Sequence, residues 1–268
     1  MTIKVCLAGA TGWAGSALAK AVHTAEDMEL VAGVSRAHAG KQLGDVLKDS
    51  GISLTLSATA AEALKSDCDV FVEYTKPEIA VQNILQAIET GAHVVVGTSG
   101  LTEDDFRRIG EAATAKGLGV LAAGNFALTA VLLQKFAETA ARFIPNCEII
   151  DYAHAGKSDV PSGTVREMAY RIGQVRQSAL EVPPEKLQGP PESRGARING
   201  TQVHAVRLPG YVISAEAIFG MPDQKLILRH EAGAGAEPYV DGAMLAIRKV
   251  STFTGLRRGL DSVMNLGA

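Results

Sequence analysis

Cysteine is scarce in this chain, and its few cysteines show no pairing pattern. Cys6, Cys68 and Cys147 lie far apart in apolar stretches, and no C-x-x-C motif occurs. This spacing argues against a disulfide-rich secreted scaffold and favours buried, reduced thiols. The sequence also has no H-E-x-x-H motif and no clustered carboxylates. It therefore predicts no metal site.

Long apolar runs and a strong net charge are missing as well. No run approaches the ~20 residues that a membrane span needs, and the first residues lead straight into a predicted strand rather than into a signal peptide. The net charge of -3 gives no general attraction to nucleic acid or to an anionic membrane. We therefore expect a cytoplasmic protein that binds neither, and an anionic ligand needs a local site.

The first half of the chain alternates short apolar runs with amphipathic stretches. Continuous Val, Ile and Leu runs separated by helices are typical of a parallel sheet covered on both faces, the doubly wound or Rossmann-type α/β fold. The predicted strands are Ile3–Ala8, Glu29–Val34, Asp69–Glu73, His93–Val96 and Gly119–Ala122. The predicted helices are Trp13–His23, Pro77–Glu89 and one that Thr102 and Asp105 cap.

The second half has more strands and fewer helices. Its pattern is typical of an α+β domain with a partly antiparallel, mixed sheet. We predict a helix over Leu128–Phe143, a strand over Cys147–Tyr152, a helix after Pro161 and a surface loop over Glu181–Gly195. Gln202–Leu208 and Val212–Phe219 are expected to form a β-hairpin around Pro209-Gly210, followed by a strand over Lys225–His230 and a closing helix over Pro238–Val250.

A glycine-rich turn directly follows the first predicted strand. The segment Gly9-Ala10-Thr11-Gly12-Trp13-Ala14-Gly15 has the spacing G-x-x-G-x-x-G and opens into a helix. Glycine is needed where the chain turns sharply, where backbone approaches a pyrophosphate, and where helix packs on strand. The amides at the helix start can then bind phosphates. Such a turn can be purely structural, but its strand–turn–helix setting favours a dinucleotide site that includes Gly9, Thr11, Gly12, Trp13 and Ala14.

The end of the second predicted strand indicates which dinucleotide binds. Enzymes that use NAD usually place Asp or Glu there to accept hydrogen bonds from the ribose. This chain has Ser35 and Arg36 at that end, and its acidic residues Asp27 and Glu29 lie at the strand's beginning. A hydroxyl and a guanidinium suit a 2′-phosphate. Although Arg36 could be an ordinary surface arginine, we expect NADPH, with weaker binding of NADH.

The segment from Asp151 to Thr164 leads from a strand through a short loop into a helix. Thr164-Val165-Arg166-Glu167 matches a capping box, which offers a structural reason for Ser162 and Thr164. The amides at the helix start, together with Lys157 and His154, would also form a pocket for an anion. One segment can serve both purposes.

At this point the sequence resembles the dihydrodipicolinate reductase family. Lys157 to Thr164 reproduces the latter half of that family's E-x-H-H-x-x-K-x-D-x-P-S-G-T. Four further stretches resemble family motifs along nearly the whole chain: Glu73-Tyr74-Thr75-Lys76-Pro77-Glu78 (D-F-[ST]-x-P-E), Gly97-Thr98-Ser99-Gly100-Leu101 (G-T-T-G-F), Gly124-Asn125-Phe126-Ala127 (N-F-S) and His204-Ala205-Val206-Arg207-Leu208-Pro209-Gly210 (H-S-V-R-L-P-G). The glycine turn alone is generic, but this ordered set is specific.

The resemblance implies a function and assigns a separate role to each of two parts of the chain. Residues 1–125 with 238–268 would bind the dinucleotide, and 126–237 would bind the substrate and form a homotetramer. The reaction would be hydride transfer to a cyclic, imine-derived dicarboxylate, 4-hydroxy-tetrahydrodipicolinate, in lysine and diaminopimelate biosynthesis. Lys157 and His154 would face the substrate in an interdomain cleft, while Ser162, Gly163 and Thr164 would bind a carboxylate. Ser99 would lie near the nicotinamide and the same substrate group. Further cofactor contacts would come from Tyr74, Thr75, Gly97, Thr98, Gly124, Asn125 and Phe126.

The chain departs from the family pattern at two places. Ala153 replaces the first histidine of the H-H pair, the residue usually assigned as general acid, and Gly233–Tyr239 replaces a serine- and arginine-containing segment. The proton must then come from water, Lys157 or His154, with His230 as a minor candidate; Tyr152, on the same strand, faces away from Ala153. We assign no role to His23 and His93. A paralogous imine or enamine-acid reductase and a catalytically silent NADPH-binding protein remain alternatives.

Overall fold

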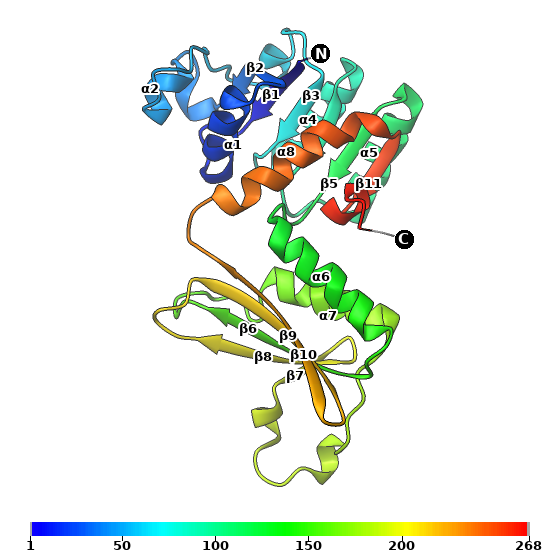
Figure 1. The fold of residues 1–268 in the computed structure, drawn as a ribbon. Helices are drawn as coiled ribbons and strands as arrows, with labels where there is room; N and C mark the ends of the chain where they lie inside the picture. Colours follow the sequence, from blue (N-terminus) through cyan, green and yellow to red (C-terminus); the bar gives the residue numbers. More distant parts are fainter. Residues whose placement is uncertain (1, 267–268) are drawn as a thin grey trace. The chain divides into compact units, whose positions relative to one another are not determined.

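The computed structural model describes residues 2–266, and these divide into two compact units (Figure 1). The first unit holds the residues up to Leu128 together with those from Ala236 onward, and the second holds Thr129–Gly235. Each unit has its own sheet and its own buried core. Among the described residues, no helix combines the length and the apolar character needed to cross a membrane.

The sheet of the first unit is entirely parallel, which confirms the Rossmann-type prediction. Its strand order is β11-β5-β4-β3-β1-β2. The bounds are β1 Ile3–Ala8, β2 Met28–Val34, β3 Val70–Glu73, β4 His93–Val96, β5 Gly119–Ala122 and β11 Gly255–Arg258. The edge strand β11 was not predicted, because Gly-Leu-Arg-Arg contains no apolar run and only Gly255 in it is buried.

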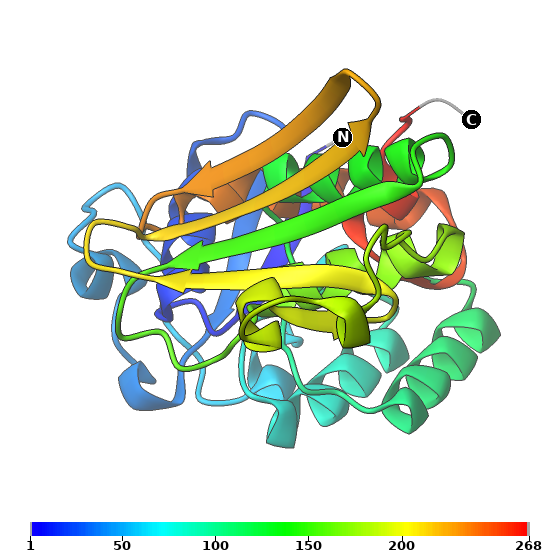
Figure 2. The same cartoon turned by 90° about the horizontal axis from the view of Figure 1, so that it is seen from below.

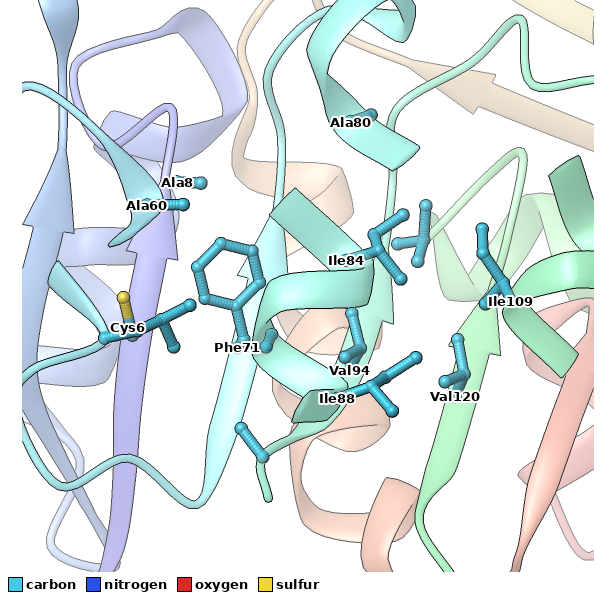
Figure 3. Close-up of a cluster of buried hydrophobic side chains, with 14 of the residues drawn as sticks. Cys6, Ala8, Ala60, Phe71, Ala80, Ile84, Ile88, Val94, Ile109 and Val120 are labelled. Carbon is cyan, nitrogen blue, oxygen red and sulfur yellow. The ribbon is translucent and has the colours of Figure 1, made fainter. Parts of the chain in front are cut away.

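Helices cover both faces of this sheet. On one face α4 (Pro77–Glu89), α5 (Glu103–Lys116) and the short α3 (Ala60–Ala63) pack against Phe71, Val94 and Val120 (Figure 3). On the other face lie α1 (Trp13–Thr24) and α8 (Val240–Lys249), which contact each other. The predicted capping box at Thr102 and Asp105 is confirmed at the start of α5. The helices α3 and α2 (Leu43–Leu47) are too short to show helical periodicity, so the sequence did not reveal them.

The second unit contains a five-stranded mixed sheet in the order β10-β9-β6-β8-β7, seen from below in Figure 2. The bounds are β6 Asn146–Ala153, β7 Ala196–Ile198, β8 Thr201–Arg207, β9 Ile213–Met221 and β10 Gln224–Ala232. Only β6 and β8 pair in parallel; the other neighbours are antiparallel. Two helices, α6 (Leu128–Ala141) and α7 (Gly163–Val175), bury their apolar sides against Ile149 and Phe219 of the sheet.

The predicted hairpin between β8 and β9 is wrong. Both strands hydrogen-bond to β6, which lies between them. Two other hairpins exist: β9 turns into β10 through Pro222 and Asp223, and β7 turns into β8 through Asn199 and Gly200. Asn199 and Gly200 both have positive φ (45° and 81°), as the two-residue primed turns of hairpins require. The Asn-Gly pair was therefore the hairpin signal, rather than Pro209-Gly210.

The closing helix also differs from its prediction. A short 3-10 turn occupies Glu237–Tyr239, and the α-helix itself runs from Val240 to Lys249. The predicted surface loop at Glu181–Gly195 contains two more 3-10 turns, Pro184–Lys186 and Pro191–Arg194.

Candidate active site

The glycine-rich turn joins β1 to α1 with no room for side chains at two positions. Gly9 has a φ of +82°, and a Cβ there would lie 2.4 Å from the carbonyl oxygen of Tyr74. A Cβ on Gly15 would lie 2.0 Å from the carbonyl oxygen of Gly9. Real Cβ atoms do not approach backbone oxygens so closely, so glycine at these positions is a steric requirement. The turn can therefore bring bare backbone against a ligand.

The start of α1 is chemically suited to an anion. Gly12 is its N-cap residue, so no side chain caps the first amides, and the first turn carries no acidic residue. Unpaired amides and the positive end of the helix dipole favour phosphate at this point. In the strand order, β1 lies between β2 and β3, where chain connections diverge to either side. Open parallel sheets bind ligands at the carboxyl ends of strands around such a switch point.

A hollow of about 640 Å³ lies next to the end of β2. Its lining includes Gly9, Ser35 and Arg36, as expected for the adenosine end of a dinucleotide, and also Lys76. The hydroxyls of Ser35 and Thr11 are 2.7 Å apart, so the glycine turn and the end of β2 are tied together. Ser35 is buried, whereas the Arg36 side chain is exposed.

A second hollow, of about 310 Å³, lies over the ends of β3, β4 and β5. It brings together most of the side chains and glycines that the family motifs single out for cofactor binding. Its lining comprises Trp13, Ala14, Tyr74, Thr75, Gly97, Thr98, Ser99, Ala123, Gly124, Asn125, Phe126 and Tyr239. Three short loops after successive parallel strands therefore converge on one site, although they lie far apart in the sequence.

A buried carboxylate links two of these loops. Glu73, at the end of β3, has no exposed surface and accepts hydrogen bonds from the Thr75 amide (2.7 Å), from the hydroxyls of Thr75 and Thr98, and from Asn83 (2.9 Å). Burial raises the pKa of Glu73, while the hydrogen bonds from Thr75 and Asn83 act in the opposite direction. The carboxylate thus fixes the positions of the loops after β3 and β4 relative to each other.

The ring of Tyr74 is held firmly within the same hollow. A Cβ on Gly97 would lie 2.0 Å from Cε1 of Tyr74, and the ring meets Phe126 edge-on with 6.0 Å between centroids. Burial raises the pKa of the Tyr74 phenol. Its hydroxyl is buried and has no hydrogen-bond partner among residues 2–266.

In the second unit, the segment from β6 to α7 carries the residues expected to bind substrate. β6 ends at Ala153, which is 0% exposed. His154 lies just beyond the strand and is exposed, and its amide bonds to the carbonyl of Val212 (3.3 Å). Strand alternation therefore does not restrict the direction of the His154 ring.

The start of α7 differs from the predicted capping box at Thr164. The helix begins at Gly163, and Ser162 is the N-cap, with its hydroxyl accepting from the Val165 amide at 3.4 Å. The same hydroxyl donates to the carboxylate of Asp151 at 2.9 Å, and the Ser162 amide donates to it at 2.7 Å. The capping prediction failed because Asp151, eleven residues away, fixes Ser162 rather than Thr164 at the cap.

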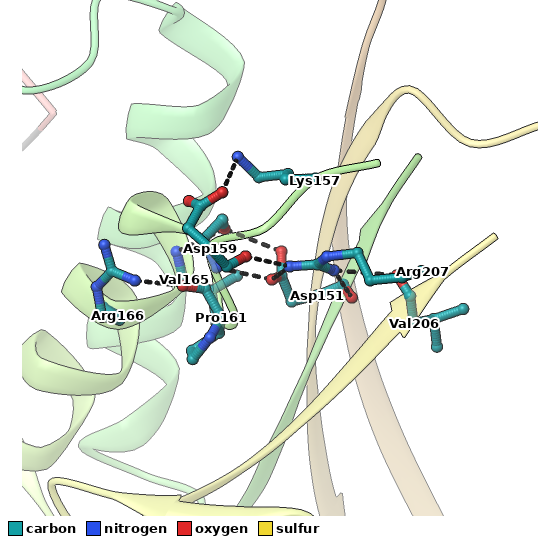
Figure 4. A network of polar contacts seen from close by, with 9 residues as sticks. Asp151, Lys157, Asp159, Pro161, Val165, Arg166, Val206 and Arg207 are labelled. Atoms are coloured by element: carbon teal, nitrogen blue, oxygen red, sulfur yellow. Dashed lines mark hydrogen bonds and ion pairs between the residues drawn. The ribbon is translucent and has the colours of Figure 1, made fainter. Parts of the chain in front are cut away.

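A buried ion pair holds this segment in place (Figure 4). Asp151 is fully buried, and Arg207 on β8 donates to its carboxylate at 2.7 Å. Arg207 also donates to the carbonyl of Asp159 at 2.8 Å. Lys157, whose side chain is 22% exposed, pairs with Asp159 at 2.7 Å. The hydrogen bond from Lys157 lowers the pKa of Asp159. The Lys157 amine is therefore held at this segment, and its place in an interdomain cleft stays a prediction.

Two further histidines, His93 and His230, contact groups within their own units. The Nδ1 atom of His93 accepts from the Gly119 amide at 2.9 Å, next to the pairing of β4 with β5. His230 lies within β10, is buried, and its Nδ1 is 2.9 Å from the hydroxyl of Thr129. Burial lowers the pKa of both imidazoles. Both rings therefore take part in structural contacts, and His230 is buried.

Comparison with known proteins identifies the family. Residues 3–126 match the model of the N-terminal part of dihydrodipicolinate reductase, and residues 129–264 match that of its C-terminal part. The chain belongs to the dihydrodipicolinate reductase family. It is therefore an NAD(P)H-dependent oxidoreductase, as the resemblance implied. Curated relatives named 4-hydroxy-tetrahydrodipicolinate reductase include those of Bacillus pumilus (36% identical) and Desulfitobacterium hafniense (34%), each aligned over 98% of both chains.

Solved structures agree with this membership. The dipicolinate-bound dihydrodipicolinate reductase from Paenisporosarcina sp. TG-14 is 30% identical, covers 98% of this chain with 100% of its own, and has a TM-score of 0.87. An amine dehydrogenase from Mycobacterium smegmatis shares the fold at a TM-score of 0.68 and 13% identity.

Sequence reasoning missed several residues of this site. Asp151 and Arg207 lie within the quoted family motifs, but neither was given a role. In the sequence, Asp151 alternates with the apolar residues Cys147, Ile149 and Ala153, so a carboxylate on the apolar side of the strand and in need of a partner was detectable. Glu73 carried the same signal at the end of an otherwise apolar strand. Tyr239 gave none, because only the fold brings it beside Trp13.

Proposed function

We propose that the protein reduces 4-hydroxy-tetrahydrodipicolinate with NADPH in lysine and diaminopimelate biosynthesis. The observation that carries this proposal is the segment Lys157–Thr164, which keeps the family motif and is clamped by the buried Asp151–Arg207 pair. Full-length relatives with that activity in their names support it. So does the solved relative, whose bound dipicolinate is a flat ring with two carboxylates.

The chain's own residues would bind and orient both ligands. Gly9 and Gly15, where a Cβ does not fit, leave room for a pyrophosphate on the amides of α1. Lys157 and the amides of Gly163 and Thr164 would bind a substrate carboxylate, with Ser162 contributing through its position at the cap. When bound, the reduced nicotinamide supplies the hydride. Loss of the substrate's 4-hydroxyl with a neighbouring ring proton, as water, would first leave a conjugated ring. The hydride would then add to a carbon of this ring and a proton to the carbon next to it, which gives tetrahydrodipicolinate.

A turnover assay with purified protein, the lysine-pathway substrate and NADPH tests this function directly. We expect substrate-dependent oxidation of NADPH. Lys157→Met should raise KM for the substrate while leaving NADPH affinity unchanged, because its amine lies in the substrate segment. A wild-type protein that binds NADPH but never oxidises it would contradict the proposal.

The preference for NADPH rests on Ser35 and Arg36 at the end of β2. Neither side chain carries the carboxylate that usually accepts hydrogen bonds from the ribose hydroxyls of NAD, while a guanidinium binds a 2′-phosphate well. Lys76 adds a second cation to the same hollow. Calorimetric titration should give a lower Kd for NADPH than for NADH. Equal or tighter binding of NADH would overturn this preference.

The proton must come from a group other than residue 153. We propose that Lys157 or His154 donates this proton. Ala153 has no proton to donate, and His154 lies just beyond the end of β6, so its ring is not held on one face of the sheet. A positioned acid is worth about 10² to 10⁴ in rate. Turnover should therefore rise in Ala153→His and fall in His154→Ala if His154 has taken over the role. Ala153 has no exposed surface, so the thermal unfolding of Ala153→His must be measured alongside.

Ala153 also favours a second candidate function, that of a paralogous imine or enamine-acid reductase or of a catalytically silent NADPH-binding protein. If neither the wild type nor a folded Ala153→His variant turns over the lysine-pathway substrate, this second candidate replaces the first. A wild type that is already fast, and is unchanged by Ala153→His, would mean that the missing acid never limits the rate.

We further propose that the protein works as a homotetramer in the cytoplasm. Tyr152, Ile218 and Ile227 share the face of the second sheet that α6 and α7 leave uncovered, and Ile227 is 47% exposed. Exposed apolar residues gathered on one sheet face favour association. The three cysteines are free thiols, in keeping with a reducing compartment. Light scattering should give four times the chain mass, and Ile227→Lys should lower it.

A further inference from the structure

Trp13 is unusually exposed for a tryptophan. Its side chain is 60% exposed, although it is the first residue of α1 and directly follows the phosphate-binding turn. Large aromatic side chains lose a favourable burial term when they stay in water. An exposed tryptophan at the edge of a hollow is therefore a candidate for contact with a ligand. Trp13 lines the 310 Å³ hollow over β3, β4 and β5.

A second aromatic residue holds the Trp13 ring in place. Tyr239, in the 3-10 turn before α8, meets Trp13 at 5.5 Å between centroids and 66° between ring planes. This edge-to-face geometry is favourable for aromatic pairs. Tyr239 lines the same hollow, so the two rings form a continuous aromatic wall. The wall is built by residues from the two ends of the unit's sequence.

The rest of the hollow is mainly polar. Thr75, Thr98, Ser99 and Asn125 contribute hydroxyl and amide groups, and Gly97 and Gly124 leave backbone accessible. An apolar wall facing a few convergent polar groups is typical of a site for a planar, polar heterocycle. The end of β2, with Ser35 and Arg36, provides a separate hollow for the adenosine half.

We propose that the nicotinamide ring of the bound dinucleotide lies against the wall formed by Trp13 and Tyr239. This inference rests on the proposed binding of NADPH. It gives a role to the segment Gly233–Tyr239, which departs from the family pattern. The wall confines the nicotinamide ring from one side, while the polar groups across the hollow bind its carboxamide and ribose.

Trp13 is the single tryptophan of the chain, so its fluorescence reports on this wall alone. The oxidised cofactor NADP⁺ is the decisive probe, because its nicotinamide quenches tryptophan through contact, whereas NADPH also quenches by energy transfer over longer distances. NADP⁺ should quench Trp13 in the wild type. The fragment 2′,5′-ADP, which lacks nicotinamide, should bind without quenching.

Variants test the same contact through affinity. Stacking of a base on an aromatic side chain is worth ~1–3 kcal/mol, so Trp13→Leu should weaken NADPH binding by about 5- to 150-fold. Tyr239→Leu should weaken it as well, and Tyr239→Phe should preserve it because the ring is retained. Binding of 2′,5′-ADP should be unchanged in all three. Phe143→Leu is the control, since Phe143 is 75% exposed but lies in the second unit, outside this hollow.

Each contrary result has a distinct meaning. If calorimetry detects NADP⁺ binding while Trp13 emission and the Trp13→Leu affinity stay unchanged, the aromatic wall is overturned and the proposed function stands. Quenching by 2′,5′-ADP alone would place the adenine at the wall, and quenching by dipicolinate alone would place the substrate there; either overturns the inference. A wild-type protein that binds no dinucleotide would overturn both the inference and the proposed function.

Discussion

The candidate phosphate site around β1 in the first unit is made mostly of backbone, whereas the site in the second unit depends on buried charged side chains. Around β1, the decisive features are positions where no Cβ fits, such as Gly9 and Gly15, and the uncapped amides of α1. Between β6 and α7, the decisive feature is the Asp151–Arg207 pair, which fixes Ser162 and the carbonyl of Asp159.

This difference has a physical reason. A dinucleotide's phosphates can be bound by amides and a helix dipole, which need no particular side chain. A segment that is proposed to present a lysine and two amides to a small dicarboxylate needs its own rigid support. Buried charges give such support only while both partners are present, because a single buried charge is costly. We therefore expect the two sites to respond differently to substitution.

The largest effect is expected at the buried ion pair. Arg207→Met would leave the Asp151 carboxylate buried without its partner, and breaking such a pair costs about 3–5 kcal/mol. The free energy of unfolding, measured in urea, should fall by that amount, and substrate KM should rise. Arg107→Met on α5 is the matched control, because its ion pairs with Asp104 and Glu111 are exposed and worth at most about 1 kcal/mol. If both variants lose the same free energy of unfolding, the buried ion pair of the second unit is no more important than an exposed one of the first unit.

The next largest effect is expected at the glycine turn. Gly15→Ala places a Cβ 2.0 Å from the carbonyl oxygen of Gly9, so the turn or α1 must shift. Such overpacking costs about 1–3 kcal/mol, and NADPH affinity, followed by calorimetry, should fall with it. Gly220→Ala in the second unit is the control, because no atom lies within 4 Å of its added Cβ. If a folded Gly15→Ala variant binds NADPH with wild-type affinity, the backbone of the glycine turn does not determine cofactor binding.

A more selective effect is expected at Arg36. Arg36→Ala would remove the charged hydrogen bond that we propose to the 2′-phosphate, worth about 1.5–3 kcal/mol, so NADPH affinity should fall by roughly ten- to a hundredfold. NADH has no such phosphate, and its affinity should stay nearly constant. Titrating the variant with both cofactors measures the difference. A parallel loss for NADPH and NADH would mean that Arg36 supports the hollow itself rather than the phosphate.

The last effect is expected at Tyr74, and it has the opposite sign. The Tyr74 hydroxyl is buried without a hydrogen-bond partner among residues 2–266, and the family motif has phenylalanine at this position. Tyr74→Phe removes a hydroxyl whose desolvation is uncompensated, a cost of about 1–3 kcal/mol, so Tm should rise. Differential scanning calorimetry checks this. A lower Tm would show that the hydroxyl has a stabilising partner in solution.

Much of the fold follows from local patterns along the chain. Apolar runs at strand spacing identify five of the six strands in the first sheet, and the glycine spacing identifies the turn after β1. The order of the motifs identifies the loops that later meet in one hollow. These features are recoverable because strand burial, turn geometry and capping depend on neighbours within a few residues.

Only the tertiary structure decides which distant residues become neighbours. It places β6 between β8 and β9, where a hairpin was predicted, because strand pairing depends on the whole sheet rather than on the turn between two strands. It selects Ser162 as the cap of α7 through Asp151, pairs Asp151 with Arg207 across 56 residues, and brings Tyr239 beside Trp13. Such contacts form because buried polar and aromatic groups must find partners, and the packed core determines which partners are within reach.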